Sequence, residues 1–340
     1  MKGISTPLTL CAALLLCRSA FTFAQMVPDP GAPPHFDAQP AAQAPSPSSA
    51  PEPGQAQPPD SQPDLPPPGP PPPASLKGFI PADQLTFLKD YAGQPTKALL
   101  KDKRFKNLEK QAISRTEYHY GRDMSLSDAV QAVLDGSTLP VEVREGRFVT
   151  VPGNSGPYLR GRTFLWFDLQ TGVALGAFYF QPTNGEPSPT VTVFSRLLTD
   201  RELSMSQLPE PFVEDMEQWA GSARIPRIST RYFIPENGKK YVLSHDEDYC
   251  WRPPGSFPPD RDACQQMNAN AADVDMNAAY FMQETGNAAN ATAWMLGPDQ
   301  VAFIGIRDRS CGLALACRIR ITHERTRVLL GHPPVPHGRR

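Results

Sequence analysis

Apolar residues recur at regular spacing only after Leu76, and as far as Leu134 they follow the period of an α-helix. Ser125 marks one boundary, because its hydroxyl can accept a hydrogen bond from the amide of Asp128 at a helix start. Three helices are predicted in this part of the chain: Pro81–Tyr91, Thr96–Lys110 and Ser125 or Leu126 to Leu134.

Beyond Leu139 the pattern changes to short runs rich in Val, Phe, Tyr, Trp and Thr, which are typical of strands. The turns between these runs contain Gly172 and Asn184-Gly185, which tolerate the positive φ of tight hairpins. The chain should therefore form an antiparallel meander. Its predicted strands are Arg147–Val151, Thr163–Leu169, Val173–Phe180 and Thr190–Leu197.

A helix around Pro211–Trp219 and two short strands, Ser229–Ile234 and Lys240–Ser244, complete this part of the chain. Residues 76–248 are therefore predicted to be an α+β domain, an antiparallel sheet with helices. Nothing in its sequence assigns it a function.

From Cys250 onward the strand pattern stops and helices are predicted again. Met267, Ala271, Val274, Ala278 and Phe281 lie four, three, four and three residues apart, which places them on one face of a helix. Residues 249–332 should form a small all-α domain stapled by disulfides, followed by a tail over 333–340. Its second and third helices are predicted at Asp299–Arg309, after an interruption at Gly297-Pro298, and at Leu315–Leu329.

The N-terminal pattern is that of an exported protein. Residues 1–24 combine Lys2, a short apolar stretch and a small residue, Ala24, and so resemble a secretory signal peptide. A lipoprotein signal would use Cys17, but the large Leu16 before it favours cleavage after Ala24. No stretch reaches the ~18 apolar residues of a transmembrane helix. A periplasmic or secreted location without a membrane span is expected.

Composition separates a linker from the folded part. Of the 40 prolines, 19 lie between Pro28 and Pro73, and the stretch has no lysine or arginine. Such a segment buries too little apolar surface to fold. Residues 25–75 are therefore predicted to be a disordered proline-rich linker that acts as a spacer.

Four cysteines remain after the signal peptide, and in an oxidising compartment an even number indicates disulfides. If the first two C-terminal helices are antiparallel, Cys311 returns towards Cys264. Of the three possible pairings, the favoured one is then Cys264 with Cys311 and Cys250 with Cys317. The chain has no closely spaced cysteine pairs of the zinc-binding kind, so no metal site is predicted.

Charge excludes some partners. The formal net charge is −2 and the chain has no long basic run, which argues against nucleic acid and anionic membrane surfaces. It also lacks a Gly-x-Ser-x-Gly elbow, a phosphate-binding glycine loop and a His-Glu-x-x-His helix, so no catalytic residue and no cofactor is predicted.

Three ordered motifs in the last third of the chain carry a family resemblance. Each follows or ends at a cysteine, and together they cover about 80 residues, with Phe303 standing where the family usually has tryptophan. The matching residues are Cys264, Ala272, Asp273, Asn277 and Tyr280, then Gln300, Phe303, Arg307, Asp308 and Cys311, then Cys317, Thr322, Arg325, Thr326 and Leu329.

This region resembles the domain of LprI-type lysozyme inhibitors, which also occurs in many exported bacterial proteins. The resemblance implies a helical domain and a possible role in blocking a lysozyme, although likeness of fold alone does not transfer activity. The motif residues are expected to be structural. Arg307 and Asp308 are adjacent on a helix and point about 100° apart, so they should bridge to other helices and not to each other.

Three other groups are weaker candidates for chemistry. His245-Asp246-Glu247-Asp248 has the oxygen and nitrogen ligands of a hard-cation site but is better read as a solvated loop. Glu117 and His119 alternate on an extended segment as a general acid and base would. Glu186, Phe178 and Phe180 would form an exposed binding edge, with a sheet core as the favoured alternative.

The expected function is that of an exported, non-enzymatic interaction protein that binds a lysozyme or another envelope protein. Two other classes stay open: a cell-envelope enzyme that acts on wall material through the central domain, and a structural or secretion-accessory envelope protein.

Overall fold

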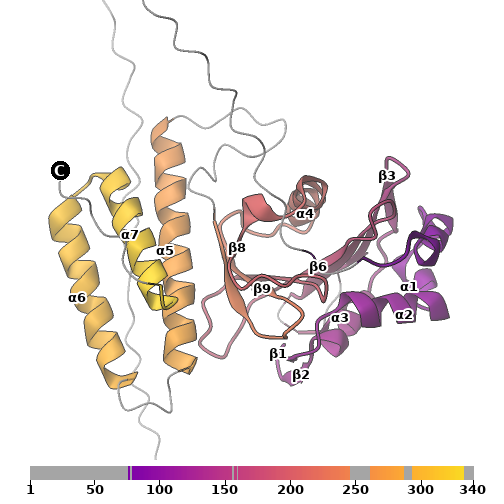
Figure 1. Cartoon of the computed structure of the whole chain (residues 1–340), viewed down its shortest axis with the longest axis horizontal. Coiled ribbons are helices and arrows are strands. Elements are labelled where there is room, and N and C mark those ends of the chain that lie inside the picture. The colour runs from indigo at the N-terminus through magenta and orange to yellow at the C-terminus, as the bar shows by residue number, and fades with distance from the viewer. Residues whose placement is uncertain are drawn as a thin grey trace, which may run out of the picture. The chain divides into compact units, whose positions relative to one another are not determined.

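The computed structural model describes residue 76 and residues 79–154, 157–158, 160–245, 261–286 and 293–332. The expected signal peptide, linker and tail, with Cys17 and Cys250, lie outside the described residues. Residues 76–245 form a mixed α+β sheet region and residues 261–332 a helical region (Figure 1), which confirms the predicted fold class. Both regions belong to one compact unit, Pro66–Arg340.

The main sheet has the strand order β3-β4-β5-β6-β7-β9-β10-β8. The meander from β3 to β7 is antiparallel, as predicted, but β9 pairs with β7 in parallel, and β8 pairs with β10 in parallel. The chain reaches β9 through α4 (Glu210–Ser222), and such a crossover makes neighbouring strands parallel. The strands are β3 (Glu142–Arg144), β4 (Phe148–Gly153), β5 (Arg162–Asp168), β6 (Ala174–Phe180), β7 (Thr190–Phe194), β8 (Leu203–Ser204), β9 (Thr230–Ile234) and β10 (Tyr241–Ser244).

The N-terminal helices are more broken than predicted. The expected helix Pro81–Tyr91 is two 3-10 helices, η1 (Ala82–Gln84) and η2 (Thr86–Tyr91). The expected helix Thr96–Lys110 divides into α1 (Thr96–Leu99) and α2 (Lys103–Ala112), because the Asp102 carboxylate accepts the Arg104 amide at 2.8 Å and caps a new start.

Helix α3 (Leu126–Leu134) begins as predicted, with the Ser125 hydroxyl accepting the amide of Asp128 at 3.0 Å. It follows a small two-stranded sheet of β1 (Glu117–His119) and β2 (Asp123–Ser125). The sequence predicts the extended segment at Glu117 and His119 but not its pairing with β2.

Helices cover both faces of the sheet (Figure 1), with α1, α2 and α3 packed on one face and α4 on the other. Of the two alternatives for Phe178 and Phe180, the favoured sheet core is confirmed and the exposed edge is wrong. Both are fully buried, and Phe178 contacts the rings of Tyr118 and Tyr120 with centroids 5.4 and 4.9 Å apart. Because helices cover both faces, every residue of β6 is buried.

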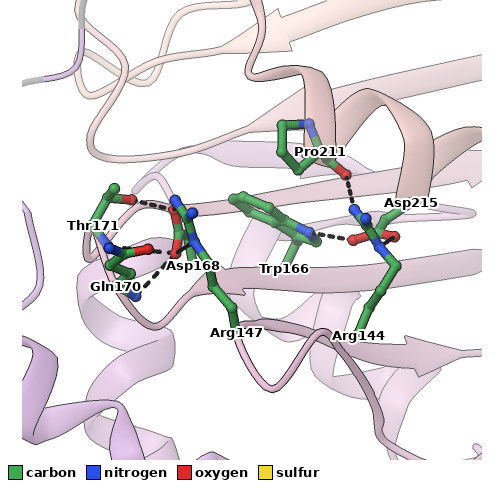
Figure 2. Close-up of polar contacts among 8 residues, drawn as sticks. All are labelled: Arg144, Arg147, Trp166, Asp168, Gln170, Thr171, Pro211 and Asp215. Carbon is green, nitrogen blue, oxygen red and sulfur yellow. Dashed lines mark hydrogen bonds and ion pairs between the residues drawn. The ribbon is translucent and has the colours of Figure 1, made fainter.

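A buried carboxylate fastens α4 to the sheet. Figure 2 shows that Asp215 accepts two hydrogen bonds from the sheet side, one from Arg144 Nε at 2.9 Å and one from Trp166 Nε1 at 2.7 Å. Arg144 also donates to the carbonyl of Pro211 at 3.3 Å. The first and second turns of α4 are thus held by one arginine.

A second carboxylate in Figure 2 shapes the β5–β6 hairpin. Asp168 binds the Arg147 guanidinium through two hydrogen bonds of 2.8 and 2.7 Å and accepts the amide of Gln170 at 2.9 Å. These contacts hold the pKa of Asp168 at about 2, against the effect of burial. Gly172 completes the turn with a φ of 76°, as predicted from its sequence.

Glu186 is buried and not exposed as expected. Its carboxylate, 1% exposed, pairs with Lys240 Nζ at 2.8 Å. The same ammonium lies over the ring of Tyr232, 4.9 Å from the centroid. The Pro182–Pro187 turn is therefore tied to the residue before β10 by an ion pair whose carboxylate is buried and whose lysine side chain is 30% exposed.

Glu109 gives the sheet region a pH dependence. Burial between α2 and its neighbours, reinforced by the charge of Asp135, raises its pKa from the usual 4.5 to about 7. The Glu109 carboxyl therefore holds its proton in the folded protein at pH values where the unfolded chain has lost it. The contribution of Glu109 to the free energy of unfolding is therefore most favourable below pH 4.5.

The free energy of unfolding should consequently fall as pH rises from about 5 to about 7, and this contribution should level off above that range. Glu109→Gln should remove this slope and stabilise the protein at pH 8 by on the order of 2 kcal/mol. Urea unfolding of both proteins at pH 5 and pH 8 measures the effect. A variant whose stability changes with pH as the wild type does would contradict it.

The helical region consists of α5 (Arg261–Gly286), α6 (Ala293–Cys311) and α7 (Leu315–Leu329). Helix α7 matches its prediction, but Gly297-Pro298 does not interrupt the second helix: Pro298 lies inside α6. Helix α7 packs between α5 and α6 (Figure 1). Met276 of α5 and Leu329 of α7 join Tyr232 and Val242 of the sheet in a shared apolar cluster.

Candidate functional site

Among the motif residues, Arg307 contacts all three helices of the helical region. Its side chain is 5% exposed, and it donates to Asp273 of α5 and to Thr322 of α7, the latter at 3.0 Å. It therefore joins all three helices, as expected of a structural residue. The expectation that Arg307 avoids Asp308 is wrong, since its Nε lies 3.2 Å from the Asp308 carboxylate. The long arginine side chain spans the 100° between adjacent positions.

Arg325 makes the second set of motif contacts. From α7 it donates to Gln300 at 2.9 Å and to Asp299 at 2.6 Å, and its guanidinium lies over Phe303, 5.2 Å from the ring centroid. The Thr326 hydroxyl bonds to the backbone of its own helix. Tyr280 packs on the shared apolar cluster, whereas Asn277 is exposed. Arg307 and Arg325 thus hold the helices together, and of the motif residues Thr326 also lines a cavity.

These contacts place polar groups on the side of α6 that faces the other helices. Its buried side chains are Gln300, Arg307 and Cys311. The large apolar residues Met295, Val301 and Ile306 are instead 53–71% exposed. Leu296 and Phe303 also pack, partly buried, against the shared apolar cluster, so both polar and apolar side chains of α6 face inward.

Met295 and Ile306 lie about 20° apart around α6, and Leu313 follows at its C-terminal end. We call these three residues the α6 apolar face. Val301 points about 120° or more away from them. With Val301 and with Val328 of α7, they account for five of the six exposed large hydrophobic residues in the part of the chain that the structure describes, Phe79 being the sixth. A concentration of apolar side chains on one surface indicates a protein-binding site, whereas single exposed residues do not.

A disulfide shapes the end of this face. Cys311 bonds to Cys317, with Cα atoms 5.5 Å apart, so the expected pairing of Cys311 with Cys264 and of Cys317 with Cys250 is wrong. Cys264 is also in a disulfide, and Cys250 lies outside the described residues. The prediction placed α6 directly beside α5, whereas α7 lies between them.

The Cys311–Cys317 bond closes the turn between α6 and α7, which we call the cysteine loop. Gly312 begins it with a φ of 52°, and Leu313 follows with 95% of its surface exposed. An apolar side chain held outward on a covalently closed loop loses little conformational freedom when a partner binds.

Arginines surround the cysteine loop. Arg309 precedes it, and Arg318 and Arg320 follow it on α7. Arg318 lies 3.5 Å from Asp308 and Arg320 lies 3.0 Å from Glu324, both in partly exposed pairs that water screens. Arg309 forms no ion pair among the described residues. The loop therefore combines a protruding leucine with a cationic rim.

A separate cavity of about 550 Å³ lies between the β8–β10 edge of the sheet and helices α5 and α7. Its lining includes a buried pair: His245 Nδ1 lies 2.7 Å from Asp275 Oδ1, and each side chain is 1% exposed. The second oxygen of Asp275 accepts the His245 amide at 2.8 Å. His245 is thus fixed inside the fold, and the other members of its expected cation site, residues 246–248, lie outside the described residues.

The predicted acid–base candidates do not gather in a cavity. His119 bonds to Asp123 at 2.8 Å across the small β1–β2 sheet, and the Asp123 side chain is largely exposed. Glu117 is exposed on the same strand. The pair of His245 and Asp275 was missed because its members are 30 residues apart. The available signal was Asp275 itself, a carboxylate within the apolar spacing of α5.

Comparisons with protein-family models, with curated proteins and with solved structures find no match to this chain. The resemblance to LprI-type inhibitors therefore rests on the motif residues themselves. In the described part of the chain, no three His, Cys, Asp or Glu side chains gather in a way that could hold a metal ion. Among the described residues, no helix has both the length and the apolarity to cross a membrane.

Proposed function

We propose that this protein is an exported, non-enzymatic interaction protein that inhibits a lysozyme through its helical region. The observation that carries the proposal is the α6 apolar face, which ends in Leu313 on the cysteine loop. Export to the periplasm or beyond is part of the proposal, and the signal-like residues 1–24 and the disulfides support it.

Charge favours a glycoside hydrolase as the partner. Such enzymes cleave their substrate between two carboxyl groups in a cleft, and lysozyme is of this type. A cationic rim formed by Arg309, Arg318 and Arg320 complements such a cleft, and Leu313 projects from that rim. The cysteine loop would enter the cleft and exclude the polysaccharide, while the α6 apolar face would pack on the enzyme surface.

Leu313→Asp should raise the concentration needed for half-maximal inhibition of a sensitive lysozyme by about 30-fold or more, since it places a charge at the centre of the contact. Lysis of cell-wall suspensions measures inhibition. Phe79→Asp is the matched control, because it changes an exposed apolar residue of the sheet region and should leave inhibition unchanged.

Leu313 is almost fully exposed, so its variant should unfold at the wild-type temperature. Equal inhibition by Leu313→Asp and the wild type would show that the cysteine loop does not contact the lysozyme. Formation of a dimer that Leu313→Asp and Ile306→Asp abolish, without any inhibition, would assign the α6 apolar face to a second copy of this chain.

An envelope enzyme is the second candidate, and the buried pair of His245 and Asp275 in the cavity favours it. A carboxylate that orients an imidazole is a recurring part of general base catalysis. The hydroxyl of Ser204, which also lines the cavity, is bonded to Ser206 and Gln207. Release of soluble fragments from peptidoglycan by the wild type but not by His245→Ala would favour this class.

A further inference from the structure

The cavity between the sheet edge and the helical region has the position and the size of a ligand-binding site. It is formed by β8 and β10 on one side and by α5 and α7 on the other, and ligand sites occur preferentially where such regions meet. Its volume of about 550 Å³ lies within the range of cavities that hold small organic molecules.

The charges that line this cavity are unevenly paired. Its two carboxylates each pair with a histidine: Glu202 lies 3.2 Å from His332, and Asp275 is held by His245. Arg201 and Arg327 also line the cavity, and among the described residues neither forms an ion pair or a side-chain hydrogen bond. The cavity lining therefore has two guanidinium groups whose donors no carboxylate of the lining uses.

His323 adds ring nitrogens that can form hydrogen bonds on the α7 side of the cavity. It lies one helical turn before Arg327, so both side chains project from the same face of α7 into the lining. Arginine binds phosphate and carboxylate groups through two parallel hydrogen bonds, a geometry that a chloride ion does not match. An oxyanion therefore suits the donors of these side chains.

The pair of His245 and Asp275 gives the cavity a fixed polar wall. An ionised carboxylate only accepts hydrogen bonds, so the Nδ1 atom of His245 carries a proton and donates it to Asp275. Because Asp275 also accepts the His245 amide, the imidazole cannot swing away. The ring is held in one orientation in the cavity lining before any ligand enters.

Apolar side chains complete the lining. Leu203, Val242 and Leu330 face the cavity together with the ring of Tyr241. A bare inorganic ion would leave these side chains without contacts and most of the volume to water. The cavity suits a molecule with an oxyanion head and an apolar or aromatic body.

We infer that this cavity binds a small organic anion, with Arg201 and Arg327 holding a phosphate or carboxylate head and Leu203, Tyr241 and Leu330 contacting its body. The inference is independent of the proposed inhibition, because none of these residues belongs to the cysteine loop or to the α6 apolar face.

Isothermal titration of the purified, oxidised chain with four probes tests it: phenyl phosphate, benzoate, inorganic phosphate and phenol. Phenyl phosphate or benzoate should bind one to one and more tightly than inorganic phosphate, and phenol should not bind. The preferred head group distinguishes a phosphate ester from a carboxylate as the ligand class. The variant Arg201→Gln/Arg327→Gln should weaken binding at least about tenfold, because it removes two charged donors.

Arg122→Gln is the control, since Arg122 is an exposed arginine that does not line the cavity. Both arginine variants should inhibit lysozyme as the wild type does, so failure of this inference and failure of the proposed function are separable. Absence of binding by both organic anions at about 10 mM, or equal binding by the double variant and the wild type, would overturn the inference.

Discussion

Lys240→Met should lower the free energy of unfolding by about 4 kcal/mol, because it leaves the Glu186 carboxylate buried without its cation. Methionine keeps most of the volume of lysine, so the apolar contact with Tyr232 persists and the loss reports the charge. Urea unfolding at pH 7 measures this loss. The dependence of the free energy of unfolding on urea concentration should be the same in both proteins if unfolding stays two-state.

The double variant Lys240→Met/Glu186→Gln is the matched control. It removes both charges, and removing both partners of a buried pair costs less than removing one. Its stability should therefore lie above that of Lys240→Met alone. A loss below 1 kcal/mol in the single variant would show that Glu186 is not held as a buried anion.

Asp215→Ala should lower the free energy of unfolding by about 3 kcal/mol, because Arg144 and Trp166 both lose their hydrogen-bond acceptor. Trp166 is 1% exposed, so water cannot replace the bond to its indole nitrogen. A third of the Arg144 side chain is exposed, so in the variant its guanidinium can form hydrogen bonds to water in place of those to Asp215. Thermal unfolding and the near-ultraviolet circular dichroism of the tryptophan measure the effect.

Glu214→Ala provides the comparison for Asp215. Glu214 is the preceding residue and also pairs with Arg144, at 3.3 Å, but its side chain is 40% exposed. Its removal should cost under about 1 kcal/mol. Equal losses from the two substitutions would mean that the contact with Trp166 contributes nothing.

Local signals accounted for much of the fold. Ser125 correctly predicted the start of α3, and Gly172 correctly predicted the β5–β6 turn, because the structure that each residue favours extends over only a few neighbouring residues. Asp102 was an equally local signal for the break between α1 and α2 and was overlooked. The two residues of β8 were too few to show any periodicity.

Contacts between distant segments were not predictable in the same way. The parallel pairing of β7 with β9 depends on where α4 carries the chain, and the disulfide depends on which helix lies in the middle of the helical region. The motif residues were predicted to be structural, and Arg307 and Arg325 have that role. The α6 apolar face was not predicted, since periodicity alone cannot tell which side of a helix faces inward.

Lysozyme inhibition itself can be measured by titrating a panel of lysozymes with the purified, oxidised chain. We expect stoichiometric inhibition of at least one lysozyme, which weakens as salt screens the arginines of the cysteine loop and is lost in Leu313→Asp. Full lysozyme activity across the panel at micromolar concentrations of the chain would contradict it.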